Sequence, residues 1–170
     1  MEEIVVLRYG HRPYRDIRVT SHCCLVARAL GANKIVIEGF EDKELKKSID
    51  NVVKRWGGKF AVSFTDSWLK EVKKFREKGF YITHLSMYGK PFNEVVKSIR
   101  KNKKVLVIIG SQKVEIGVYQ ESDLNVSIGK QPHSEIGALA VYLDRLFEGK
   151  ELDKKFKGAK IELTEKDEKK

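Results

Sequence analysis

The hydrophobic positions of the chain alternate between short runs rich in β-branched residues and longer stretches with helical periodicity. The short runs predict strands at residues 4–8, 34–38, 60–64, 80–85, 105–109 and 124–128. The longer stretches predict helices at residues 20–30, 42–56, 67–78, 92–101 and 134–147. Because the strands are apolar throughout, both faces of their sheet must be covered. We therefore expect an α/β fold, with a mostly parallel sheet and helices on both faces.

The C-terminal part of the chain has a different pattern. Residues 150–170 are mostly charged and contain one apolar island at residues 159–163. We expect the island to form a short β extension folded back on the domain, and residues 164–170 to fray. With 170 residues and no internal repeat or linker, the sequence predicts a single domain over residues 1–170, in which residues 149–170 are a charged extension.

An excess of Lys and Arg gives the chain a net charge of +10 and an isoelectric point of about 9.5. Such an excess favours binding to a polyanion, and RNA or DNA is the partner class that it indicates first. A Lys- and Glu-rich surface of the kind found in thermophiles explains the same composition without nucleic acid. No apolar run is long enough to span a membrane and no signal peptide precedes the first strand, so we expect a cytoplasmic protein with no membrane partner.

Several familiar chemistries find no support in the sequence. It contains no phosphate-binding glycine loop, no dinucleotide fingerprint and no nucleophile elbow. Its four histidines lack the spacing of a zinc site, so we expect no metal. The adjacent Cys23 and Cys24 cannot form an unstrained disulfide with each other, and their position in a helical stretch favours burial in the core.

Glycine and serine cluster where three predicted strands end, at residues 84–89, 110–114 and 128–135. Taken singly, such loops usually serve turn chemistry. Together, at the carboxyl ends of parallel strands, they predict one pocket for a flat, polar ligand. The last loop leads into a predicted helix, for which Ser134 or His133 is the expected N-cap.

Residues 8–18, here called the arginine segment, form a loop broken by glycine and proline that also contains a histidine and two tyrosines. Its arginines are Arg8, Arg12, Arg15 and Arg18. Arginines form paired hydrogen bonds with phosphates and tyrosines stack on bases, so this mixture favours RNA. The alternative is a solvated loop with one structural ion pair, between Asp16 and either Arg15 or Arg18.

Five short motifs of the chain form a recognisable set. They are residues 7–13 (Leu-Arg-Tyr-Gly-His-Arg-Pro), 16–22 (Asp-Ile-Arg-Val-Thr-Ser-His), 27–32 (Ala-Arg-Ala-Leu-Gly-Ala), 87–89 (Met-Tyr-Gly) and 131–135 (Gln-Pro-His-Ser-Glu). On these motifs the chain resembles the SPOUT class of methyltransferases over nearly its whole length. It is most similar to the archaeal tRNA ribose 2′-O-methyltransferases that modify the cytidine at position 56 of the T-loop. It departs from the expected pattern after Val114, where residues 115–117 (Glu-Ile-Gly) replace an expected proline.

The resemblance implies a C-terminal trefoil knot whose loops bind S-adenosylmethionine, with no metal. The cofactor-binding residues that it implies are Leu85, Gly110, Ser111, Gln112, Lys113, Val114, Ile128, Gly129, Lys130, Gln131, Pro132, His133, Ser134 and Glu135. It also implies a homodimer, in which the arginine segment of one subunit completes the site of the other. The helix at residues 134–147, with Tyr142 and Leu146 beside its core stripe, is our candidate for the dimer interface.

The resemblance also places an arginine of the N-terminal motif near the reacting ribose oxygen. We expect Arg18 to be the catalytic residue and to act as an electrostatic clamp on the developing oxyanion, because a guanidinium does not readily accept a proton. Arg8, Arg12 and Arg15 are expected to hold tRNA phosphates, and His133 is the alternative proton acceptor. For the whole chain, the alternatives are a non-catalytic basic RNA-binding module and a SPOUT methyltransferase that acts on another RNA nucleotide.

Overall fold

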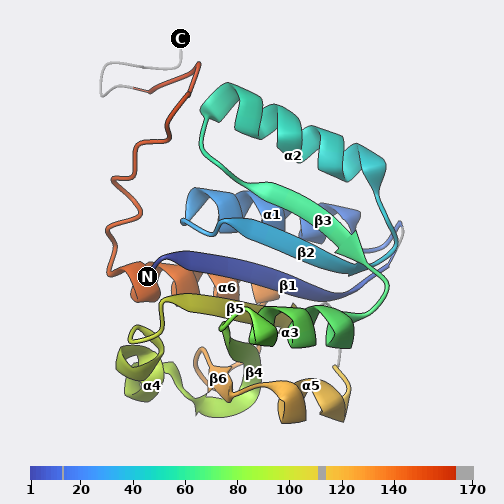
Figure 1. Ribbon diagram of the computed structural model, residues 1–170, viewed down its shortest axis with the longest axis vertical. Helices are drawn as coiled ribbons and strands as arrows, with labels where there is room; N and C mark the ends of the chain where they lie inside the picture. The colour runs from blue at the N-terminus through green and yellow to red at the C-terminus, as the bar shows by residue number, and fades with distance from the viewer. Residues whose placement is uncertain (13, 111–113, 164–170) are drawn as a thin grey trace.

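A computed structural model describes residues 1–12, 14–110 and 114–163 of the chain (Figure 1). Strands and helices alternate along these residues, as the sequence predicts. The strands are β1 (Glu3–His11), β2 (Lys34–Gly39), β3 (Ala61–Thr65), β4 (Tyr81–Pro91), β5 (Lys104–Gly110) and β6 (Leu124–Ser127). The helices are α1 (Ile17–Ala29), α2 (Lys43–Trp56), α3 (Trp68–Glu77), α4 (Phe92–Ile99), α5 (Ile116–Glu121) and α6 (Glu135–Phe147).

The six strands form one sheet in the order β3-β2-β1-β5-β4-β6, and every neighbouring pair is parallel. This arrangement confirms the predicted α/β class. β1 lies inside the sheet, where Val5 pairs with Lys34 of β2 and with Leu106 of β5. Since β5, β4 and β6 are neighbours that run in the same direction, their carboxyl ends meet at one edge, where open parallel sheets bind ligands.

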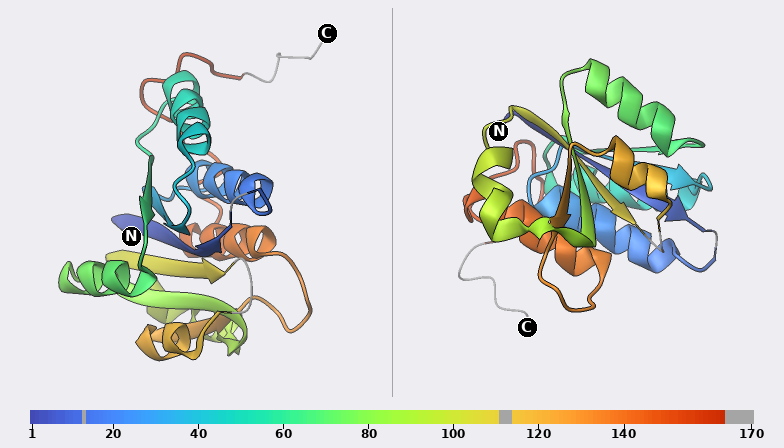
Figure 2. Two further views of the ribbon diagram at one scale, coloured as in Figure 1. Left: turned by 90° about the vertical axis from the view of Figure 1, so that its right-hand side faces the viewer. Right: turned by 90° about the horizontal axis from the view of Figure 1, so that it is seen from below.

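Side chains along the strands alternate between two hydrophobic clusters, one on each face of the sheet. Ile4 and Val6 of β1 belong to the cluster that includes α1, α2, α4 and α6. Val5 and Leu7 belong to the cluster that includes α3 and α5. Figure 2 shows α1, α2 and α6 on one side of the sheet and α3 on the other. The prediction of helices on both faces is therefore confirmed.

The two cysteines lie on the face of α1 that packs against the sheet. Cys23 and Cys24 have no exposed surface and both are free thiols, as the sequence predicts. Burial is the main cause that raises the pKa of Cys23 to about 11 and the pKa of Cys24 to about 12. Both side chains therefore remain neutral core residues at physiological pH.

The face of α6 that we expected at a dimer interface lies in the core of the protomer. Tyr142 has no exposed surface, its hydroxyl lies 2.7 Å from the Thr83 hydroxyl, and its ring stacks on Phe92. Leu146 is 4% exposed. The prediction for these two residues is wrong, because both already pack inside their own subunit. Val141 is the large apolar residue that the described part of α6 exposes.

β4 extends beyond its predicted end and contains the segment that the sequence indicated as a loop. Its pairing with β6 shifts register between Leu85 and Lys90, and both of these residues are aligned with Val126. The intervening residues 86–89 are thus extra residues in one strand, which bend it at the edge of the sheet. A second difference is α5, a short helix that the sequence analysis did not predict.

The apolar island at residues 159–163 does not form the predicted β extension. Instead, the backbone N–H groups of Lys160 and Ile161 both donate to the carbonyl oxygen of Arg55, near the end of α2. In Figure 1, this C-terminal segment runs from α6 along the amino-terminal side of the sheet towards α2. The segment therefore packs against a helix end, without the row of partners that a strand requires. Among the described residues, no helix combines the length and apolar character needed to cross a membrane.

Candidate functional site

A pocket of about 270 Å³ lies at the carboxyl ends of β4, β5 and β6, beside the start of α6. Its lining residues are Leu85, Ser86, Met87, Ile109, Gly110, Ile128, Gly129, His133, Ser134, Glu135 and Ala138. All three predicted strand-end loops contribute to this lining, so the structure brings them together at one edge of the sheet. Apolar and polar groups both form the wall, which suits a flat ligand with polar edges.

The structure places the predicted cofactor-binding residues in three different ways. Those that line the pocket are Leu85, Gly110, Ile128, Gly129, His133, Ser134 and Glu135. Lys130, Gln131 and Pro132 are exposed and lie outside the lining, and Val114 packs against the cluster on the α3 side of the sheet. Residues 111–113 (Ser-Gln-Lys) lie outside the described part of the chain.

Four lining residues are absent from the predicted cofactor-binding set, although Ser86 and Met87 belong to the strand-end loop at residues 84–89 that the sequence indicated for the pocket. Ser86 and Met87 directly follow the predicted Leu85, and they reach the pocket because β4 is irregular there. Ile109 precedes Gly110, and Ala138 lies one helical turn after Ser134. Extending each predicted motif by its strand and helix neighbours would have found all four.

The loop between β6 and α6 is held by its own polar groups. The Ser134 hydroxyl accepts a hydrogen bond from the Gly137 N–H at 3.2 Å, which confirms Ser134 as the N-cap. Both ring nitrogens of His133 face carbonyl oxygens, at 2.6 Å from Ile128 and 3.1 Å from Ser134. The His133 ring thus lies between two backbone carbonyls of the loop and braces it.

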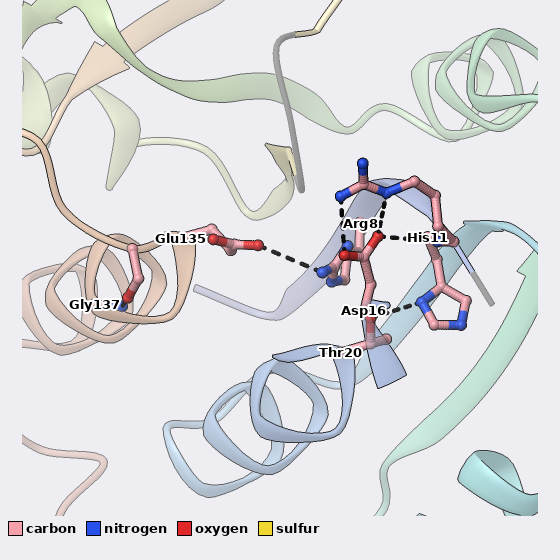
Figure 3. A network of polar contacts seen from close by, with 8 residues as sticks. Arg8, His11, Asp16, Thr20, Glu135 and Gly137 are labelled. Carbon is pink, nitrogen blue, oxygen red and sulfur yellow. Dashed lines mark hydrogen bonds and ion pairs between the residues drawn. The ribbon is translucent and has the colours of Figure 1, made fainter. Parts of the chain in front are cut away.

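A buried arginine links the pocket to the N-terminal part of the chain. Arg8 of β1 has no exposed surface, and its Nη2 lies 3.4 Å from Oε1 of Glu135 in the pocket. Within the described part of the chain, its Nε and Nη1 have no hydrogen-bond partner. Figure 3 shows Arg8 between Glu135 and Asp16. This position does not suit the phosphate contact that we predicted, because the side chain presents no surface to RNA.

The ion pair of the arginine segment is formed by Arg12 and Asp16. The Arg12 guanidinium donates to both carboxylate oxygens of Asp16, at 2.8 and 3.0 Å, and the Arg12 backbone N–H donates at 3.0 Å. These hydrogen bonds lower the pKa of Asp16 to about 2. The predicted alternatives, Arg15 or Arg18 with Asp16, are therefore wrong. Because Asp16 is the N-cap residue of α1, the pair ties Arg12 to the start of that helix.

His11 attaches the arginine segment to α1. It is 3% exposed, and its Nδ1 lies 2.8 Å from the Thr20 hydroxyl on α1. Burial lowers the pKa of His11, and the nearby charge of Arg8 lowers it further. Arg15 and Arg18 are exposed beside these anchored residues, and neither lines the pocket of its own subunit.

Comparisons with known proteins show which family this chain resembles. A family model described as "tRNA ribose 2'-O-methyltransferase, aTrm56" matches residues 56–170. The tRNA (cytidine(56)-2'-O)-methyltransferase of Methanothrix thermoacetophila is 51% identical over 155 residues, which cover 91% of this chain and 88% of that protein. The protein of the same name from Pyrococcus horikoshii is 50% identical over 165 residues, which cover 95% and 80%.

Solved structures share the fold at much lower identity. The TrmH/SpoU tRNA modifying enzyme of A. aeolicus has a TM-score of 0.66 and 15% identity, covering 91% of this chain and 81% of that chain. The SpoU methyltransferase AviRb from Streptomyces viridochromogenes, in complex with the cofactor AdoMet, has a TM-score of 0.61 and 17% identity, covering 88% and 58%. With the fold, the pocket and these similarities together, the chain belongs to the aTrm56 family of tRNA ribose 2′-O-methyltransferases.

Proposed function

We propose that this protein transfers a methyl group from S-adenosylmethionine to the ribose 2′-hydroxyl of cytidine 56 in tRNA. The observation that carries the proposal is the identity of about half of all aligned residues to proteins named for that reaction, over more than nine-tenths of this chain. The pocket, the net positive charge and the shared fold with an AdoMet-bound methyltransferase support it.

The pocket residues fit S-adenosylmethionine. Gly110, Ile128 and Gly129 line the pocket, so their backbone lies within reach of the polar edge of a flat base, and apolar side chains supply a surface for its face. Glu135 adds a carboxylate that lies 3.4 Å from the Arg8 guanidinium and is 22% exposed, and an accessible negative charge suits a cationic ligand. Our proposal includes the C-terminal trefoil knot that the resemblance implies.

When bound, S-adenosylmethionine supplies an electrophilic methyl group. As the ribose oxygen forms its bond to the methyl carbon, the carbon–sulfur bond breaks and the sulfonium leaves as a neutral thioether. The hydroxyl gives its proton to solvent, so negative charge develops on the oxygen. A preorganised guanidinium at that oxygen stabilises the charge. Arg18 is our candidate because the resemblance places an arginine of the N-terminal motif there, and it lies exposed at the first turn of α1. His133 is a weaker candidate, because both of its ring nitrogens face carbonyl oxygens.

The role of Arg18 requires a second subunit in our proposal. Arg18 does not line the pocket of its own subunit, so a homodimer has to bring it to the pocket of the other. Tyr14, at 95% exposure, and Ile17, at 38%, place apolar surface beside it. We expect light scattering to return the mass of a dimer at micromolar concentration, and a monomer mass would contradict the shared site.

Transfer of labelled methyl to an unmodified tRNA transcript, followed by mapping of the modified ribose, tests the proposed function. Gly129→Val tests whether methyl transfer depends on the pocket. Gly129 lines the pocket with a φ of +75°, and a valine side chain would project into the open space beside it. We expect it to abolish cofactor binding in calorimetry. Gly79→Val is the matched control, since Gly79 has a φ of +78°, equally open surroundings and no place in the pocket.

Each outcome of this assay has a distinct meaning. Equal losses in Gly129→Val and Gly79→Val would show that backbone strain, and not the pocket, explains the effect. Methyl label on another ribose would keep the methyltransferase and reject the assigned nucleotide. No heat with S-adenosylmethionine, together with tight tRNA binding, would favour the non-catalytic RNA-binding module.

A further inference from the structure

A second pocket, of about 310 Å³, lies at the opposite edge of the sheet from the first. It is formed where the end of α1, the turn after α2 and the C-terminal segment meet. Its lining residues are Arg28, Ala32, Asn33, Gly57, Gly58, Lys59, Phe60, Lys154, Lys155, Phe156 and Lys157. Five of these side chains are cationic and none is acidic, so the pocket carries a concentrated positive charge.

Arg28 is the buried cation of this pocket. It is 8% exposed, its Nη2 donates to the Gly57 carbonyl oxygen at 2.7 Å, and its guanidinium lies 4.7 Å from the ring centre of Phe156. Within the described residues, its Nε has no hydrogen-bond partner, and no carboxylate forms an ion pair with it. A buried charge without a counter-charge is unfavourable, and an anion in the pocket would compensate it.

The C-terminal segment is fitted closely to this place. Gly58 donates its N–H to the Lys157 carbonyl oxygen at 2.9 Å. A Cβ at Gly57 would lie 2.5 Å from the backbone nitrogen of Ala159, and one at Gly58 would lie 2.5 Å from the Phe156 ring. The two glycines therefore allow the segment to pack against the chain, and this packing holds the lysines at residues 154–157 over Arg28.

We propose that this pocket binds the phosphate backbone of tRNA and is a second RNA contact, separate from the methyl-transfer pocket. The proposal rests on the proposed function for the identity of the RNA. Lys154, Lys155 and Lys157 are exposed around the pocket, and several ammonium groups spread over a surface match successive phosphates. A small free anion would use only part of this charge.

The location favours an RNA that reaches beyond the catalytic pocket. Residues 154–157 lie at the amino-terminal edge of the sheet, and the first pocket lies at the carboxyl edge. A strand of six residues such as β2 separates the two edges by about 20 Å. A folded RNA presents phosphates over a wider span than this, so one tRNA can contact both edges. Contacts of this kind position the substrate and leave the choice of nucleotide to the catalytic pocket.

The test is the affinity of the full-length protein for an unmodified tRNA transcript at several salt concentrations. We expect the triple variant Lys154→Gln/Lys155→Gln/Lys157→Gln to weaken binding about tenfold and to reduce the salt slope by about 2. Its turnover at saturating tRNA and its affinity for S-adenosylmethionine should equal those of the wild type. The matched control is Lys70→Gln/Lys73→Gln/Lys78→Gln on α3 and its C-cap. It removes the same charge from the other face of the sheet, also from exposed lysines that form no salt bridge within the described residues.

Each result supports or overturns the proposal. An affinity and a salt slope within twofold of the wild type would overturn it, as would an equal loss in the α3 control. Inorganic phosphate that binds the wild type as tightly as tRNA, and does not bind the triple variant, would assign the pocket to a free anion. Absence of methyl transfer by the wild type would reject the proposed function, while the tRNA-binding comparison would still decide this inference.

Discussion

The arginine segment at the N-terminus and the lysines at residues 154–157 have the same sign of charge but different surroundings. In the arginine segment, Arg8 is buried against Glu135 and Arg12 is held by Asp16, so half of the arginines have internal partners. The three lysines at residues 154–157 are exposed, and none of them has a salt bridge within the described residues. The comparison shows that a count of basic residues overstates the charge available to RNA where carboxylates lie in the same segment.

The largest expected effect distinguishes the buried arginines from the exposed ones. Arg8→Ala should lower the free energy of unfolding by about 3 kcal/mol, because it leaves a cavity in place of a fully buried side chain and removes the ion-pair partner of Glu135. Arg15→Ala should change that free energy by less than about 0.5 kcal/mol, since its side chain is exposed. It should instead reduce the salt slope of tRNA binding by about 1. Urea unfolding and salt-dependent tRNA binding measure the two effects, and a similar stability loss in both variants would remove the distinction.

The next effect separates catalysis from binding within the exposed arginines. Arg18→Ala should reduce methyl transfer about a hundredfold, the scale observed when one preorganised stabiliser of developing charge is removed. Affinity for S-adenosylmethionine should barely change, because the strand-end loops that line the pocket remain intact. Single-turnover transfer at saturating tRNA is the measurement. Full turnover in Arg18→Ala would make the clamp role untenable, and Arg15→Ala serves as the control with the same loss of charge.

The smallest effect concerns the ion pair that closes the arginine segment. The pKa of Asp16 is lowered to about 2, so its carboxylate stabilises the folded state above the ordinary aspartate pKa of about 4. This contribution should be lost as the pH falls from about 4 to about 2. Asp16→Asn should therefore be less stable than the wild type near neutral pH, and the difference should shrink over that interval. Urea midpoints at several pH values measure it, and a difference that is constant with pH would contradict the assignment.

Local patterns predicted the fold well where each element had a strong pattern of its own. The parallel sheet, the helices on both faces and the Ser134 cap all follow from apolar runs, glycines and a capping residue that are close in sequence. The pocket was also predictable in outline, because parallel strands bring their ends to one edge. Arg8 could have been placed too, since it continues the apolar run of residues 4–7 within one strand.

The features that were missed depend on contacts distant in sequence. The irregularity of β4 arises because β6 pairs with residues on both sides of residues 86–89. The course of residues 159–163 depends on the Arg55 carbonyl and on the space left by Gly57 and Gly58, about 100 residues earlier. The burial of Tyr142 depends on Thr83 and Phe92. None of these partners is visible in the local pattern of the segment concerned.

The two thiols of α1 give this protein a built-in probe of local unfolding. Alkylating reagents attack the thiolate, and the raised pKa values of about 11 and about 12, with no exposed surface, leave Cys23 and Cys24 unreactive in the closed state. Labelling therefore requires α1 to separate from the sheet, and its rate reports the free energy of that opening. Because α1 begins at the arginine segment, a ligand that orders this segment should slow the labelling of both thiols. The labelling rate should fall by the factor by which the ligand favours α1 packed on the sheet over α1 separated from it.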